Sequence, residues 1–128
     1  MRKGLKIFSY LPNPRVWKAE IAAKIAGITI EVIGDKPSEI PNWLWDSEPK
    51  KLSDSDKREF KQFERTGKRG FSSALYKTDD FIKLIPFGTV PAAFSPDGKI
   101  GIFESNSILR AIARQDDINH LYGKDAFE

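Results

Sequence analysis

The sequence of 128 residues contains no cysteine and only one histidine, His120. Without cysteine the chain can form no disulfide and no thiolate metal site, and it has no sulfur nucleophile of its own. A single histidine disfavours both a Ser-His-Asp relay and a histidine-rich metal site. We therefore expect neither a bound metal nor a resident cofactor.

Long hydrophobic runs and a strong charge of either sign are also absent. The longest stretch without a charged residue, Leu84 to Pro96, contains three prolines and is too short to cross a bilayer. The apolar run after the basic start is short and is broken by Pro12 and Pro14, so no targeting segment is indicated. The net charge of +3 is too small to indicate nucleic acid binding. We expect a cytoplasmic protein, and its length fits one compact domain.

The N-terminal residues predict a strand, a helix and a second strand. Leu5 to Leu11 form a short apolar run typical of a buried strand. Trp17, Ile21 and Ile25 recur every four residues and predict the apolar face of a helix. Apolar and polar side chains alternate from Ile28 to Val32 and predict a second strand, which ends near Gly34 and Asp35. The length of the crossover favours parallel pairing of the two strands.

The later part of the chain predicts a helix, a hairpin and a final helix. Thr78 can cap a short helix that runs to Leu84. Residues 90–94 and 100–103 predict two antiparallel strands, because the turn between them, Ser-Pro-Asp-Gly at 95–98, has proline and glycine where turns favour them. Ser105 is expected to cap the last helix, whose apolar side chains face one way.

This part of the chain contains two short motifs, Pro-Phe-Gly-Thr-Val-Pro at residues 86–91 and Phe-Glu-Ser-Asn-Ser-Ile at residues 103–108. They resemble two motifs of the N-terminal domain of glutathione transferases. The first is similar to the family's stretch that leads into a cis-proline, and the second is similar to its acidic-Ser motif that opens a helix. The resemblance implies an α/β, thioredoxin-like fold of order βαβ–α–ββα over residues 1–115, with a charged, partly helical insertion at about 37–77. It also implies that residues 116–128 are a polar linker toward a missing helical domain.

The first helix adds a narrower resemblance. Tyr10, Arg15 and the runs Trp-Lys-Ala at 17–19 and Ile-Ala-Ala at 21–23 look most like the gamma subunits of eukaryotic elongation factor one, whose first domain is transferase-like. Because such domains often serve as scaffolds, this resemblance implies an alternative function as a non-catalytic module.

The transferase resemblance implies a glutathione site across both motifs. A cis bond before Pro91 would turn the Val90 backbone outward, so that it pairs with the cysteinyl unit as a neighbouring strand would. In the family, the residue matching Glu104 reaches the amino group of the γ-glutamyl unit, and the residue matching Ser105 holds its carboxylate. Thr89 stands where many relatives place a lysine or glutamine near the glycyl carboxylate. From the residues alone, two other interpretations stay open: the bond before Pro91 is trans, and Ser105 is an ordinary helix cap.

Catalysis of this type requires a hydroxyl that hydrogen bonds to the glutathione thiolate and so lowers the pKa of the thiol. Ser9 and Tyr10, at the end of the first strand, are the candidates, and Asn13 is a third polar group nearby. Because neighbouring strand residues point to opposite faces, at most one of the two hydroxyls faces the ligand. Thiol-transfer chemistry is excluded, since no cysteine stands at this position.

The charged insertion predicts a helix from Ser53 to about Gly67, with Phe60 and Phe63 on one face. This helix could present a basic surface to RNA or an acidic partner, or it could be a solvated amphipathic helix packed through its phenylalanines. We favour the second interpretation, so nucleic acid is not expected as a partner. The tryptophans of residues 43–45 are expected to be packing anchors. The basic residues concerned are Lys57, Arg58, Lys61, Arg65, Lys68 and Arg69.

The sequence thus predicts the glutathione-binding domain of a glutathione transferase-like protein, which conjugates the glutathione thiolate to electrophiles if the full protein is active. The alternative is a protein-interaction module of a translation elongation factor one complex, with elongation factor subunits as partners. Without the helical domain we expect low activity and exposed apolar surface, which favours a homodimer.

Overall fold

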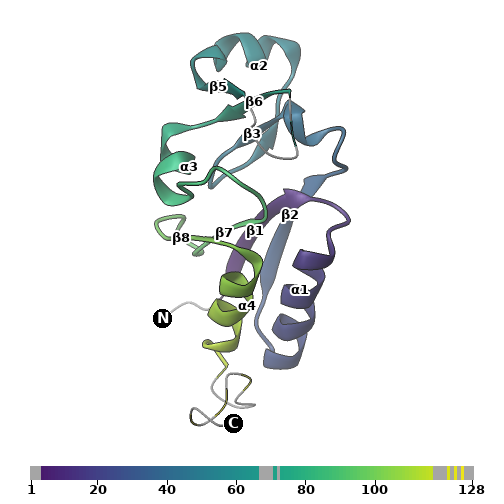
Figure 1. Ribbon diagram of the computed structural model, residues 1–128, viewed down its shortest axis with the longest axis vertical. Helices are drawn as coiled ribbons and strands as arrows, with labels where there is room; N and C mark the ends of the chain where they lie inside the picture. Colours follow the sequence, from purple (N-terminus) through teal and green to yellow (C-terminus); the bar gives the residue numbers. More distant parts are fainter. Residues whose placement is uncertain are drawn as a thin grey trace.

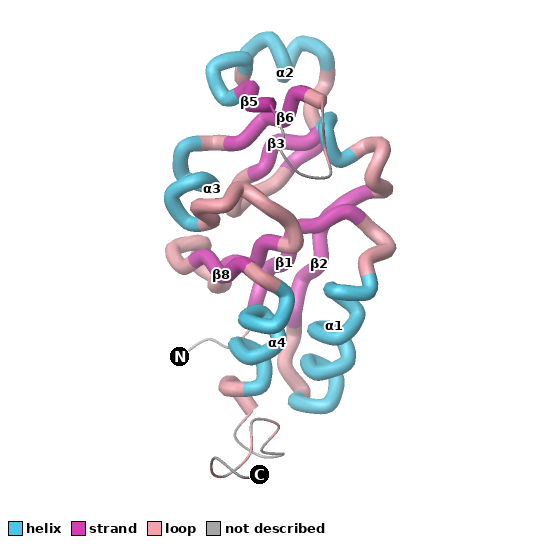
Figure 2. The backbone as a smooth tube through the Cα atoms, viewed as in Figure 1, coloured by secondary structure: helices cyan, strands magenta, loops and turns pink. Residues whose placement is uncertain are grey.

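The computed structural model describes residues 4–66, 71, 73–116, 121, 123 and 125, and it contains two four-stranded sheets. The first sheet carries helices α1 and α4, and the second sheet lies above it with helix α2 at the far end (Figures 1 and 2). The second sheet is formed by the 37–77 segment, so this segment is a substantial part of the structure rather than a surface loop.

The first sheet has the strand order β2-β1-β7-β8. β1 (Leu5–Tyr10) pairs in parallel with β2 (Ile30–Asp35), as predicted. β7 (Ala92–Phe94) pairs antiparallel with β1 on its other side and with β8 (Gly101–Phe103), which completes the predicted hairpin. The first sheet and its helices therefore have the predicted order βαβ–α–ββα.

Both faces of the first sheet are covered. α1 (Pro14–Ala26) and α4 (Ser105–Ala113) lie side by side on one face (Figure 1), and α3 (Asp79–Leu84) covers part of the other. Because strand side chains alternate, Ile7 joins the core cluster under α1 and α4 while Phe8 joins the cluster under α3. The ends of β1 and β7 and the start of α4 are thereby fixed near one another.

The apolar face predicted for α1 is not the face that the fold buries. Trp17, Ile21 and Ile25 are 50%, 60% and 55% exposed, whereas the buried residues of this helix are small or β-branched. Alanines let α1 approach the sheet and α4 closely, and bulky side chains at those positions would hold the helix away. The tryptophan and isoleucines therefore form an apolar stripe on the outside of the helix. The buried residues are Val16, Ala19, Ala22 and Ala23.

The start of α4 also differs from the prediction, because Ser105 is the first helical residue and Glu104 is the cap. Glu104 has a φ of 75°, and its carboxylate accepts hydrogen bonds from the backbone N–H groups of Asn106 (3.0 Å) and Ser107 (3.3 Å). The carboxylate supplies the capping acceptor that we expected from the serine hydroxyl.

The second sheet has the order β4-β3-β6-β5. A turn of 3-10 helix (Ile40–Asn42) leads into β3 (Trp43–Trp45), which pairs antiparallel with β4 (Lys50–Lys51) and in parallel with β6 (Ala74–Lys77). β5 (Glu64–Thr66) pairs antiparallel with β6. The sequence patterns predicted none of these strands.

Helix α2 (Asp54–Glu59) begins where the sequence predicts. The Ser53 hydroxyl accepts from the Asp56 N–H, and the Asp56 carboxylate accepts from the Ser53 N–H, which forms a capping box. The prediction that this helix continues to about residue 67 is wrong, since the chain passes through a 3-10 turn (Lys61–Phe63) into β5. Among residues singled out above, Gly67, Lys68, Arg69 and His120 lie outside the described residues.

Trp45 joins the two sheets and has the packing role expected of it. Its side chain is 1% exposed and its ring lies 5.7 Å from that of Phe8 and 5.9 Å from that of Phe81, both in edge contact. The indole N–H donates to the Ile40 carbonyl oxygen at 3.3 Å. Residues of the first sheet, α3 and the 37–77 segment thus share one core.

No helix in the described part of the chain is long and apolar enough to span a membrane. Most of residues 116–128 lie outside the described residues, so the linker remains a prediction.

Candidate functional site

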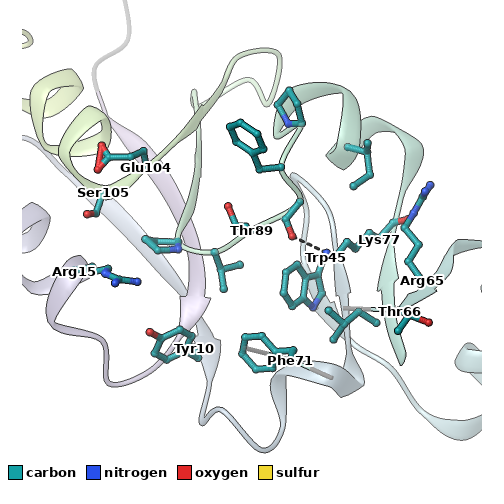
Figure 3. A pocket seen from close by; sticks show the side chains of 17 residues that line it. Tyr10, Arg15, Trp45, Arg65, Thr66, Phe71, Lys77, Thr89, Glu104 and Ser105 are labelled. Atoms are coloured by element: carbon teal, nitrogen blue, oxygen red, sulfur yellow. Dashed lines mark hydrogen bonds between the residues drawn. The ribbon is translucent and has the colours of Figure 1, made fainter. Parts of the chain in front are cut away.

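A groove of about 1090 Å³ lies between the first sheet and the 37–77 segment (Figure 3). One wall comes from the end of β1, the residues before β7 and the start of α4, and the other wall comes from β3, β5, β6 and Phe71. Almost all the predicted site residues line it, namely Tyr10, Thr89, Val90, Pro91, Glu104 and Ser105. The fold therefore brings together residues from three separate parts of the sequence.

Ser9 is the exception. Its side chain is fully buried, its hydroxyl donates to the Tyr10 carbonyl oxygen at 3.0 Å, and it accepts from the Asn13 amide nitrogen at 2.9 Å. The Asn13 side-chain oxygen in turn accepts from the Arg15 N–H at 3.0 Å and caps α1. Ser9 and Asn13 thus fix the turn between β1 and α1, and of the two candidate hydroxyls only that of Tyr10 lies on the groove.

The middle of the groove has an unpaired stretch of backbone. The Val90–Pro91 peptide bond is cis, as is the Leu11–Pro12 bond. The N–H and C=O groups of Val90 form no hydrogen bond within the described part of the chain. Since backbone groups of a folded chain are nearly always paired, with protein or with water, this edge is open to an extended ligand.

One end of the groove presents Ser105, Glu104 and Arg15. Within the described residues, neither the Ser105 hydroxyl nor the Arg15 guanidinium has a hydrogen-bond partner, and both residues line the groove (Figure 3). The Glu104 carboxylate caps α4 but still has free acceptor positions, because a carboxylate can accept about four hydrogen bonds. This end can therefore bind a group that carries both an ammonium and a carboxylate.

The other end of the groove is cationic. The Lys77 ammonium donates to the Gly88 carbonyl oxygen at 2.6 Å and lies 4.8 Å from the centre of the Trp45 ring. Burial, with a smaller effect of the nearby Arg65 charge, lowers the pKa of Lys77 from its ordinary value. Arg65 donates to the Lys77 carbonyl oxygen at 3.1 Å and forms an ion pair with Asp79 at 2.8 Å. Within the described residues Lys77 has no carboxylate partner, so it can accept an anionic ligand group.

Aromatic rings line the groove between these ends. The ring of Phe71 lies 6.1 Å from that of Tyr10 and 5.9 Å from that of Trp45, perpendicular to the latter. Sequence reasoning identified neither Phe71 nor Lys77 as a site residue. Each lies in or beside a charged stretch with no motif. The pairing of β3 with β6 brings Lys77 to the groove, and the contact with the Trp45 ring places Phe71 there.

The described residues contain no group of three histidine, aspartate or glutamate side chains that could hold a metal ion. A hollow of about 340 Å³ on the outside of α1 is lined by Trp17, Glu20, Ile21 and Lys24, and belongs to the exposed apolar stripe.

No protein-family model matches the sequence. The chain is 28% identical over 125 residues to probable elongation factor 1-gamma 2 of Arabidopsis thaliana, an alignment that covers 98% of this chain and 22% of that protein. It is 42% identical over 52 residues to elongation factor 1-gamma 2 of Oryza sativa subsp. japonica, covering 41% of this chain and 12% of that protein. At most about a fifth of these relatives is therefore matched.

Solved structures with the same fold are glutathione transferases. Isozyme E7 of Drosophila melanogaster matches with a TM-score of 0.54 at 15% identity, over 96% of this chain and 40% of that chain. Transferase F2 of Populus trichocarpa matches with a TM-score of 0.52 at 21% identity, over 96% and 42%. A transferase of Methylobacterium radiotolerans in complex with glutathione sulfonate matches with a TM-score of 0.52 at 18% identity, over 97% and 41%. The chain thus has the thioredoxin-like fold found in glutathione transferases, and its sequence is similar over nearly its whole length to elongation factor 1-gamma.

Proposed function

We propose that this chain is a glutathione-binding domain of a glutathione transferase-like protein. The observation that carries the proposal is the unpaired Val90 backbone at the centre of a groove whose two ends differ in charge. An extended peptide can pair with such an edge as another strand would. A solved structure of this fold, with a TM-score of 0.52, contains glutathione sulfonate, which further supports a ligand of this class.

The charges of the groove favour one orientation of the tripeptide. Its cysteinyl unit pairs with the Val90 backbone, and its γ-glutamyl amino and carboxylate groups lie at Glu104 and Ser105. The glycyl carboxylate then points to the opposite end, where Lys77 donates to Gly88, two residues before Val90. Thr89 lies between Gly88 and Val90, where many relatives of the transferase family place a lysine or glutamine. Lys77 therefore supplies the positive charge that threonine lacks.

Ser105→Ala is expected to weaken glutathione binding about 10- to 150-fold, because the hydroxyl donates to the ligand carboxylate and a hydrogen bond to a charged group contributes about 1.5–3 kcal/mol. Isothermal titration with glutathione measures this affinity, and we expect the unmodified chain to bind with a millimolar or lower dissociation constant. Ser107→Ala is the matched control, since Ser107 lies on the same helix but does not line the groove. Equal losses in both variants would contradict the assignment.

Tyr10 is proposed as the group that activates the thiol. Its ring lines the groove beside Phe71, and its hydroxyl has no hydrogen-bond partner within the described residues. The hydroxyl would donate to the glutathione thiolate, which lowers the pKa of the thiol. The thiolate then attacks an electrophilic carbon, a sulfur–carbon bond forms, and a leaving group departs with the bonding electron pair.

Tyr10→Phe should raise the pKa of the bound thiol by about 1–2 units while changing glutathione affinity at neutral pH only slightly, since one hydrogen bond to the anion is lost. Ultraviolet absorbance of the thiolate, followed against pH with saturating glutathione, gives this pKa. Tyr76→Phe serves as the control, because Tyr76 lies in β6 away from the groove lining. A thiol pKa that is the same in the unmodified chain, in both variants and in free glutathione would show that Tyr10 does not activate the thiol.

A second candidate function is a non-catalytic interaction module of an elongation factor one complex in the cytoplasm. The sequence similarity to elongation factor 1-gamma over 125 residues favours it, and so does the exposed stripe of Trp17, Ile21 and Ile25. Absence of glutathione binding, together with co-purification of elongation factor subunits, would favour this candidate over the first. Sedimentation of the purified chain would test the homodimer that the same stripe could form.

A further inference from the structure

We infer that Lys77 is a covalent binding site for aromatic aldehydes, at which the side-chain amine forms an imine with the aldehyde carbon. The inference goes beyond the proposed function, because the reaction uses an amine of this chain and needs no glutathione. Lys77 lies at the end of the groove that the 37–77 segment forms, away from the Tyr10 hydroxyl (Figure 3).

The second sheet fixes the position of this amine. Lys77 is the last residue of β6 and is paired with Trp45 of β3. Because directly paired residues of neighbouring strands share a face of the sheet, the lysine side chain lies beside the indole, with its Nζ atom 4.8 Å from the ring centre. The Arg65 side chain donates to the Lys77 carbonyl oxygen at 3.1 Å, and the next residue, Thr78, caps α3. The backbone that carries the amine is therefore held on both sides.

The amine faces the groove without a neutralising partner. Within the described residues the Lys77 Nζ atom contacts the Gly88 carbonyl oxygen at 2.6 Å and the Trp45 ring, but no carboxylate. A Cβ atom on Gly88 would lie 3.0 Å from this nitrogen, so the glycine leaves the space that the amine occupies. Burial, and to a smaller extent the Arg65 charge, lowers the pKa of Lys77. A larger fraction of the amine is therefore neutral at neutral pH, and the neutral amine is the nucleophile.

The reaction balances without an oxidant or a reductant. The amine donates its electron pair to the aldehyde carbon, a carbon–nitrogen bond forms, and a proton passes from the nitrogen to the oxygen. The hydroxyl group then takes a proton from solvent and leaves as water while the carbon–nitrogen double bond forms. The protonated imine keeps one N–H, which can donate to the Gly88 carbonyl oxygen, and its positive charge stays beside the Trp45 ring. The two contacts that hold the ammonium thus also suit the product.

The surroundings of the amine select an aromatic aldehyde. The Trp45 ring stands perpendicular to the Phe71 ring at 5.9 Å, and both residues line the groove. Aromatic rings pair favourably at centroid distances of about 4.5–7 Å, which contributes roughly two- to tenfold in affinity beyond the burial of area. Arg65 also lines this end and forms an ion pair with Asp79. Two cations against one carboxylate leave a positive charge, so the aromatic ring can carry an anionic group.

The test measures the rate of imine formation at each lysine of the folded full chain. The chain is incubated without glutathione at neutral pH with 4-carboxybenzaldehyde and sodium cyanoborohydride, which reduces each imine to a stable secondary amine. Peptide mass spectrometry then quantifies the modified lysines. We expect Lys77 to react about tenfold faster than Lys83, which is exposed on α3 and does not line the groove. With propanal, which has no ring, this preference should fall to about twofold.

Two variants and an unfolded sample serve as controls. Lys77→Arg keeps a positive charge beside Trp45 and should abolish the fast modification while the circular dichroism spectrum is retained. Lys83→Arg is the matched control and should leave the fast modification unchanged. In urea the preference for Lys77 should disappear, because the folded groove creates it. Equal rates at Lys77 and Lys83 in the folded chain would overturn the inference. A preference that is equally large with propanal, or that survives in urea, would overturn it as well.

Discussion

Trp45→Ala should lower the free energy of unfolding by about 3–5 kcal/mol, the largest loss that a single core truncation in this chain is expected to cause. The indole is 1% exposed and contacts the rings of Phe8, Phe71 and Phe81 at 5.7–5.9 Å. Its N–H also donates to the Ile40 carbonyl oxygen at 3.3 Å, and the truncation would remove this buried hydrogen bond, although that oxygen still accepts from the Trp43 N–H. The truncation would therefore loosen the contact between the 37–77 segment and the first sheet.

The same change should damage the groove. Trp45 supports Phe71, and the Lys77 ammonium lies 4.8 Å from its ring, so both wall residues lose a fixed neighbour. Urea unfolding followed by far-ultraviolet circular dichroism measures the stability, and the glutathione titration measures the groove. Trp17→Ala is the matched control, because this side chain is 50% exposed and its loss should change stability by less than about 1 kcal/mol. Similar losses in the two variants would mean that Trp45 does not join the sheets.

The first sheet could be predicted because its signals are local. β1 is an apolar run, α1 has an asparagine cap and a C-terminal glycine, and the hairpin has a turn sequence between two short apolar segments. What these signals cannot show is which side of a helix the tertiary structure buries. The spacing of Trp17, Ile21 and Ile25 is as regular as that of the alanines, and only the close approach of α1 to α4 and the sheet decides between the two faces.

The second sheet could not be predicted for a different reason. Its strands have two to four residues, and two of them are rich in charge. Its central pair joins Leu44 to Tyr76 in parallel, and so depends on a contact between residues far apart in the sequence. Local propensity gives no sign of such a pairing. The start of α2 at Ser53 could be predicted, but its end could not, because the chain turns there to pair β5 with β6.

The two walls of the candidate site show the same contrast between local signals and contacts between distant residues. The sequence motifs identified the wall that contains Val90, Pro91 and Ser105, because these residues belong to short stretches with a known pattern. Alternation along β1 predicts that at most one of the two candidate hydroxyls faces the ligand. Ser9 is buried and Tyr10 lines the groove, so Tyr10 is the candidate that stays. The opposite wall comes from the second sheet, and its residues could not be found before that sheet was known.

Gly34→Ala should prevent stable folding, with a loss of about 4 kcal/mol or more. The sequence placed this glycine at the end of a strand, but it pairs with Ser9 inside the parallel β1–β2 ladder. A Cβ atom here would lie 1.8 Å from the Ser9 carbonyl oxygen, which belongs to the β1 backbone and is held by the β1–β2 ladder. Relief of the clash requires separation of the two strands that position Tyr10 and the turn into α1.

Gly27→Ala separates this steric effect from the conformational freedom of glycine. Gly27 has a φ of 68° at the end of α1, but an added Cβ would meet no atom within 4 Å, so only the strain of a left-handed residue remains, about 1 kcal/mol. Urea unfolding of the two variants, each against the unmodified chain, should therefore show a small loss at Gly27 and a near-complete loss of the folded state at Gly34. A folded Gly34→Ala variant of nearly normal stability would contradict the close approach of β2 to β1 at Ser9, and with it the placement of the Tyr10 end of the groove.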